Sequence, residues 1–104
     1  MMVVTSNEIP GKRITHVFGV ARGSTIRCKP IGEDLLASFR NLVGGEITEY
    51  TSMIAEAREQ AFDRMIQHAR EMGGNAVVAM RFSTTEVVQG AAEILAYGTA
   101  VRVE

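Results

Sequence analysis

Residues 49–76, EYTSMIAEAREQAFDRMIQHAREMGGNA, constrain the fold more than any other part of the chain. Apolar side chains recur there at intervals of three and four residues, which is the spacing of one face of an α-helix. Gly73 and Gly74 follow, and glycine readily adopts the left-handed conformation that ends helices. The stretch therefore predicts a long helix from about Thr48 to Met72.

This helix is apolar on more of its circumference than one sheet can cover. Its apolar residues sweep roughly 200° at 100° per residue, against roughly 100° for a helix with a single buried face; they are Tyr50, Met53, Ile54, Ala57, Ala61, Phe62, Met65, Ile66, Ala69 and Met72. The expected strands 13–28 and 91–103 are also more than twice the usual length of ~5–6 residues. Surplus helix and strand surface together predict that the domain completes its burial against copies of itself.

The other elements follow from local patterns, in the order β, β, α, α, β, β. Residues 2–6 and 76–82 are rich in apolar and β-branched side chains, and 83–90 is expected to be a polar connection with some strand character. A second, short helix is expected from Glu33 to Val43, with acids at its start and Gly44 and Gly45 at its end. The ARGS sequence at 21–24 predicts a bend or bulge, and Gly98 marks a bulge or a close backbone approach.

Composition restricts the class of protein. A chain of 104 residues forms one domain, 1–104. Eleven basic and twelve acidic side chains nearly cancel, which gives no basic surface for nucleic acid. The start MMVVTSNEIPGKR lacks the features of a signal peptide, and no segment is apolar enough to span a bilayer. Because Cys28 is the single cysteine, we expect no intrachain disulfide and a reducing, cytoplasmic location.

Two polar side chains, Arg58 and His68, flank the apolar arc of the long helix. Arg58 has two interpretations, either contact with a carboxylate or carbonyl at an interface, or binding of an anionic ligand in a cleft between subunits. His68 lies near the helix C-terminus, where a cation is favoured, and a structural role is expected in preference to catalysis.

Several motifs resemble the YbjQ-like family of small bacterial and archaeal proteins of unknown function. They are TSNEIPGKRI, LLASFRNLVGGEITEY, AREQA, GGNAVVAM and YGTAV, and they extend over nearly the whole chain. The resemblance implies an α+β subunit with a long helix on a small antiparallel sheet and extra strands that join subunits into a ring, typically a pentamer. Asn41 departs from the family pattern, in which an acid is common at this position.

The resemblance also carries a heavy-metal-binding label, which the residues support poorly. A transition-metal site needs three or four converging His, Cys or carboxylate ligands, whereas His16, Cys28 and His68 show no HxxxH or CxxC spacing. We therefore expect neither a metal nor a cofactor.

These features predict a ring-forming oligomer that binds a small anionic ligand between subunits. The candidate ligand-binding residues are Arg40, Tyr50 and Arg58, all at family motif positions; no catalytic residues are assigned. Two alternatives remain open at this stage, a heavy-metal-binding protein and an enzyme of unknown reaction.

Overall fold

The computed structural model describes residues 1–28 and 48–104, with the side chains of the second part described from Ser52 onward. The expected α+β class is confirmed. The elements are β1 (Met2–Val3), β2 (Ile14–Cys28), α2 (Thr48–Glu71), β3 (Ala76–Val88) and β4 (Ala91–Val103). The short helix expected at 33–43 lies outside the described residues.

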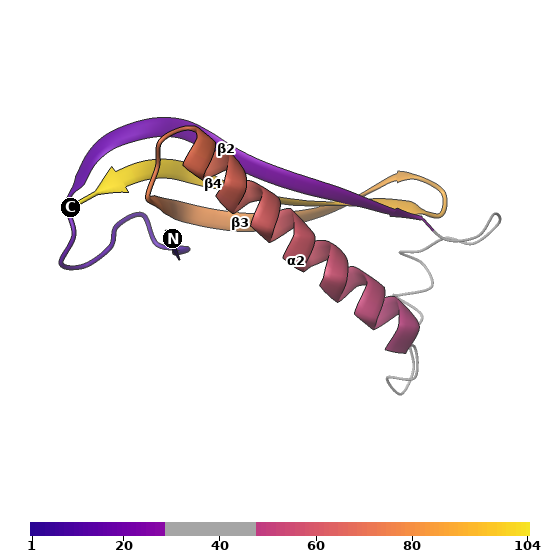
Figure 1. Cartoon of the computed structure of the whole chain (residues 1–104). Helices are drawn as coiled ribbons and strands as arrows, with labels where there is room; N and C mark the ends of the chain where they lie inside the picture. The colour runs from indigo at the N-terminus through magenta and orange to yellow at the C-terminus, as the bar shows by residue number, and fades with distance from the viewer. Residues whose placement is uncertain (29–47) are drawn as a thin grey trace.

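The four strands form one sheet in the order β1-β3-β4-β2 (Figure 1). β4 pairs antiparallel with both β2 and β3, as expected for a small antiparallel sheet. β1 instead runs parallel to β3, with Met2 opposite Ala76, so the sheet is mixed. β2 and the β1–β3 side form the two edges of the sheet.

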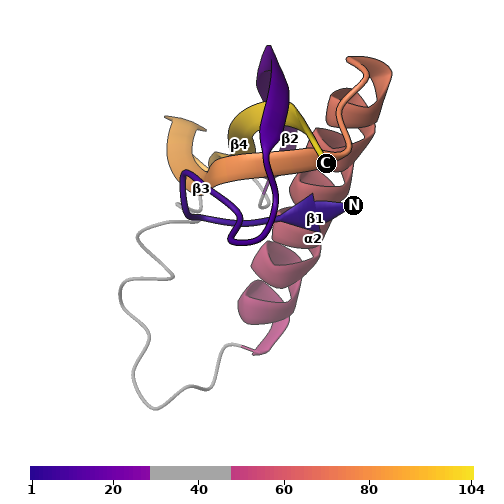
Figure 2. The same ribbon diagram turned by 90° about the vertical axis from the view of Figure 1, so that its left-hand side faces the viewer.

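α2 packs on one face of the sheet, mainly on β2 and β4 (Figures 1 and 2). The contact is close because the buried ridge of the helix consists largely of alanine: Ala57, Ala61, Met65 and Ala69, each with no exposed surface. Opposite this ridge lies Gly23 of β2. A Cβ atom at Gly23 would fall 2.6 Å from the Cβ of Arg64 and closer still to Met65 N and Ala61 O. Small side chains on both elements thus allow the two backbones to touch.

The opposite face of the sheet, called here the outer face, is covered only at one end. The segment that follows β1 folds beneath that end and buries Ile9 against Ala76, Val78 and Val101. Backbone hydrogen bonds fix this segment to β3, from Ala79 N to Ser6 O (2.8 Å) and from Met80 N to Val4 O (3.1 Å). The rest of the outer face is without such a cover among the described residues.

Two local expectations differ from the structure. β3 continues to Val88, so residues 83–88, expected as a polar connection with some strand character, are part of the strand itself. The irregularities of β2 fall between Ile14 and His16 and between Val17 and Gly19, not at residues 21–24. Because of the second irregularity, Val17 and Val20 both pair with outer-face residues of β4, although residues three positions apart in a regular strand face opposite sides.

The expected close approach at Gly98 is confirmed. A Cβ atom there would lie 2.6 Å from Val77 Cγ1 and 3.0 Å from Val78 O. The irregularity itself lies in β3, between Val78 and Arg81, where Ala79 has a φ of 55°. β4 therefore needs glycine because its neighbour bulges toward it.

Candidate functional site

Polar side chains of α2 form hydrogen bonds along the edge of β2 that faces away from β4. The backbone N–H of Arg22 donates to Nδ1 of His68 (3.0 Å), and Arg64 Nη1 donates to the carbonyl of Ser24 (2.6 Å). Further along the same edge, Arg27 Nη2 donates to Gln60 Oε1 (2.7 Å). These three contacts use backbone groups and side chains that would otherwise face solvent, and they give His68 the structural role expected for it.

The structure describes the three predicted binding residues to different extents. Arg40 lies outside the described residues, and Tyr50 is described only as a backbone position in the first turn of α2. Arg58 is exposed on α2, next to the fully buried Ala57, and has no ion-pair partner among the residues described. The structure therefore does not bring these three side chains together within the part of the chain that it describes.

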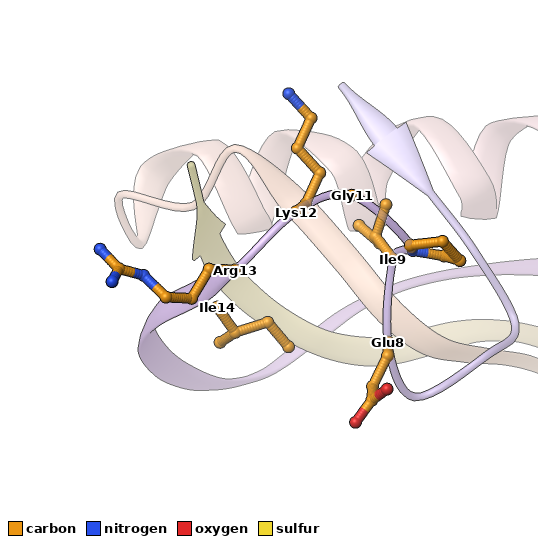
Figure 3. A pocket seen from close by; sticks show the side chains of 7 residues that line it. Glu8, Ile9, Gly11, Lys12, Arg13 and Ile14 are labelled. Atoms are coloured by element: carbon orange, nitrogen blue, oxygen red, sulfur yellow. The ribbon is translucent and has the colours of Figure 1, made fainter.

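A hollow of ≈ 390 Å³ lies beside the turn at residues 8–14. The turn is closed by Lys12 N donating to Ile9 O (3.0 Å), with Pro10 and Gly11 between them, and Gly11 has the positive φ of 80° that such a turn requires. The charged side chains of Glu8, Lys12 and Arg13 point away from one another (Figure 3). Because no charged groups converge in it, the hollow is not a candidate site.

Metal-ligand residues are dispersed over the described part of the chain, where no three His, Cys, Asp or Glu side chains form a group. Cys28 is exposed at the end of β2. His16 stacks on Phe18 with ring centroids 6.1 Å apart, and His68 already accepts the N–H of Arg22.

The sequence patterns did not predict one arrangement of side chains on the outer face. Tyr97 of β4 pairs with Arg22 on β2 and with Arg81 on β3, so three neighbouring strands present an arginine, a tyrosine and another arginine in one row. The YGTAV motif pointed to Tyr97, but the arginines lie at unrelated sequence positions. Only the register of the sheet brings them together.

Within the residues described, no helix is long and apolar enough to cross a bilayer.

Known proteins resemble this chain in sequence and in fold. It is 55% identical over 104 residues to a UPF0145 protein of Clostridioides difficile, and it covers 93% of that protein. A UPF0145 protein of Methanosarcina acetivorans is 53% identical over 103 residues, with 97% of that protein covered. A crystal structure of a protein of unknown function from Pediococcus pentosaceus, of the DUF74 family, superimposes with a TM-score of 0.66. That match covers 100% of this chain and 98% of the other at 17% sequence identity, and it supports the fold alone.

A family model described as "Putative heavy-metal-binding" matches residues 1–104. Together with full-length relatives at about 55% identity, this match shows that the chain belongs to the YbjQ_1 family of uncharacterised UPF0145 proteins.

Proposed function

We propose that the chain is the subunit of a cytoplasmic homo-oligomeric ring, a pentamer, that binds a small anionic ligand between subunits. The observation that carries the proposal is the apolar surface that one chain leaves exposed. Six large apolar side chains on the strands are 44–67% exposed; they are Val17, Val20, Ile26, Phe82, Val87 and Val88. Three of them, Val17, Val20 and Ile26, lie on the outer face of β2, and apolar side chains gathered in this way mark an interaction site on a small domain.

The shape of the single chain supports the same proposal. Its principal extents are 49 × 25 × 15 Å, and its radius of gyration is 16.2 Å. A compact domain of about 100 residues has a radius of gyration of about 13 Å. The N-terminal end of α2 projects away from the strands in both views of the ribbon (Figures 1 and 2). An elongated chain with a projecting helix gains burial when copies pack side by side.

The two edges of the sheet offer a way for such copies to join. β1 covers the β3 edge only at Ala76 and Val77, and the backbone bonds of the following segment extend that cover to Met80. On the other edge, α2 protects the middle of β2 through His68 and Arg64. A remaining strand edge pairs readily with another chain, and contact between two different edges closes into a ring when the rotation permits.

Arg58 supports the anion-binding part of the proposal. Its side chain is exposed near the middle of α2, and a guanidinium keeps its charge at any physiological pH. A neighbouring subunit that packs against this part of α2 would exclude water around Arg58. A phosphate or carboxylate would then supply the negatively charged partner that Arg58 lacks among the described residues.

Light scattering of purified protein at micromolar concentration tests assembly. We expect the mass of an oligomer, with five subunits as the proposed number. A stable, folded monomer at that concentration would overturn the proposal.

Arg58→Met tests the ligand, because methionine keeps an apolar side chain of similar length and removes the charge. We expect phosphate and acetate to raise the thermal midpoint of the wild type, and the variant to lose this stabilisation while it remains assembled. Arg70→Met, at another exposed position of α2, is the matched control and should respond like the wild type. An equal response of Arg58→Met and wild type would remove the anion from the proposal.

The donor set of the described residues does not fit the heavy metal of the family description. A metal needs several converging ligands, whereas the histidines hold other contacts and no group of three donors forms in this part of the chain. Native mass spectrometry of untagged protein separates the two functions, because a retained organic mass and a retained metal mass differ.

A further inference from the structure

The outer face carries a row of three side chains, Arg22–Tyr97–Arg81, in which two arginines flank an aromatic ring. Arg22 and Arg81 flank Tyr97 directly, one on each side, in the antiparallel register. Neighbouring strands lie ~4.8 Å apart, so the two arginine Cα atoms are separated by roughly 10 Å with the tyrosine midway. This face is opposite α2, since the neighbours Ala21 and Ala96 belong to the core beneath the helix.

The three side chains are accessible. Tyr97 is 37% exposed, and both arginines are exposed. Arg22 donates its backbone N–H to His68, and its guanidinium has no hydrogen-bond partner within the described residues. A phenol ring on an open sheet face is a stacking platform for another planar ring.

Two backbone carbonyls of the same chain hold the Arg81 side chain in place. Its Nη1 atom donates to the carbonyls of Thr5 (3.0 Å) and Met80 (2.7 Å). Met80 N also donates to Val4 O, so these carbonyls lie on the side of β3 away from β4. The Arg81 guanidinium is therefore held away from Tyr97, and Arg22 is the arginine beside the ring with guanidinium donors left for a ligand.

The charge around the row is positive. The acid of β4 on this face is Glu93, four residues from Tyr97 and therefore about 13 Å away along the strand. The row between them consists of Ser24, Leu95 and Ser83, which are uncharged. Neither arginine belongs to an ion pair in the described part of the chain.

We propose that the Arg22–Tyr97–Arg81 row binds a planar aromatic ligand that carries a phosphate or carboxylate group. The ring of the ligand stacks on Tyr97, and its anionic group accepts hydrogen bonds from a flanking guanidinium. Guanidinium matches both anions in a bidentate geometry, which a single ammonium group does not provide. The site is open rather than enclosed, so we expect a dissociation constant of about 0.1–1 mM.

The row does not include Arg58, but Val20 and Ile26, two of the apolar side chains assigned above to assembly, lie on the same face of β2 as Arg22. The proposal therefore requires that the assembled protein leaves the row open. Arg22→Gln tests it without touching α2, and light scattering of that variant shows whether assembly is unchanged.

An NMR titration of the assembled wild-type protein supplies the test, because chemical shifts report weak binding residue by residue. The probes are adenosine 5′-monophosphate, benzoate, adenosine and ribose 5-phosphate. We expect the monophosphate to shift the signals of Arg22, Tyr97 and Arg81. It should also bind more tightly than adenosine or ribose 5-phosphate. Benzoate distinguishes a carboxylate site from one that requires phosphate.

Matched variants assign the interactions. Arg22→Gln and Tyr97→Leu should each lower the affinity for adenosine 5′-monophosphate by about tenfold. Tyr97→Phe keeps the ring and should bind like the wild type. Arg70→Gln removes the same charge from α2 and should bind like the wild type. Thermal unfolding verifies that each variant is folded.

Several outcomes would overturn the proposal. They are the absence of binding by both aromatic anions, equal affinity of Arg22→Gln and wild type, and adenosine binding as tightly as its monophosphate. Ribose 5-phosphate binding as tightly as the nucleotide would refute the stacking on Tyr97.

Discussion

At the scale of the residue, His68 shows why a polar group lies beside an apolar helix face. Its Nδ1 atom accepts the backbone N–H of Arg22, so that nitrogen carries no proton in this contact and the neutral ring holds its proton on Nε2. The helical spacing placed His68 beside the apolar residues correctly. Its partner could not be predicted, because a backbone N–H of an edge strand leaves no mark in the sequence.

Replacing His68 by leucine should lower the free energy of unfolding by about 1 kcal/mol, because the N–H of Arg22 loses its acceptor. His68→Asn should lose less, since the amide oxygen of asparagine lies where Nδ1 lies in histidine. Urea unfolding of the two variants measures the difference. Equal losses would show that the hydrogen bond contributes nothing to stability.

Ala79 is a second informative residue, because it has a φ of 55° without being glycine. It occupies the irregularity of β3 and donates its N–H to Ser6 O. The left-handed conformation costs an L-residue about 1–2 kcal/mol, whereas glycine adopts it freely.

Ala79→Gly should therefore raise the free energy of unfolding by about 0.5–1 kcal/mol, after the entropy of the more flexible unfolded chain is subtracted. Ala55→Gly is the control, because glycine within α2 should instead lower stability by about 1 kcal/mol. Thermal unfolding by circular dichroism measures both changes. A loss of stability in Ala79→Gly would contradict the strained conformation at this position.

At the scale of the element, the packing of α2 on β2 depends on a run of small residues. Ala57, Ala61 and Ala69 form the helix side of the contact, and Gly23 forms the strand side. The alanines were part of the predicted apolar arc, yet Gly23 was interpreted as a bend. Glycine in a strand indicates either a bulge or a close approach, and only the position of the helix distinguishes them.

Gly23→Ala should be destabilising by at least ~2 kcal/mol, in the upper part of the range for overpacked cores. The added methyl group would meet backbone atoms of α2 that cannot rotate away. Ser24→Ala, at the next residue, should change stability by less than ~0.5 kcal/mol if the backbone carbonyl keeps its bond to Arg64. Chemical denaturation of both variants compares the two positions, and similar midpoints would contradict the close approach.

Element boundaries were predictable where a strong local signal exists. The start of α2 at Thr48 and its end before Gly73 follow from the helical spacing and the glycine pair. The length of β3 was underestimated, because residues 83–88 include Ser83, Thr84, Thr85 and Glu86, which resemble a loop in isolation. Their pairing with β4 makes them a strand, and pairing between distant residues is not a local property.

At the scale of the whole molecule, the main prediction is that stability depends on protein concentration. If folded subunits are linked by assembly, mass action raises the thermal midpoint as the concentration increases. A hundredfold increase should raise the midpoint of this small chain by about 10 °C. Calorimetry across that range measures the shift, and a constant midpoint would indicate that the single chain is stable by itself.

The pairing of β2 with β4 also determines the order in which the chain gains its structure. Arg27 pairs with Ala92, 65 positions later, and Met2 of β1 pairs with Ala76, 74 positions later. The β3–β4 hairpin, in contrast, joins Val88 to Ala91. Closing a long loop costs entropy before the contacts it allows have formed, so we expect the hairpin to form early and β2 and β1 to pair late. We therefore expect slow folding for a chain of this length, with the hairpin exposed to misassembly until β2 and β1 have paired with it.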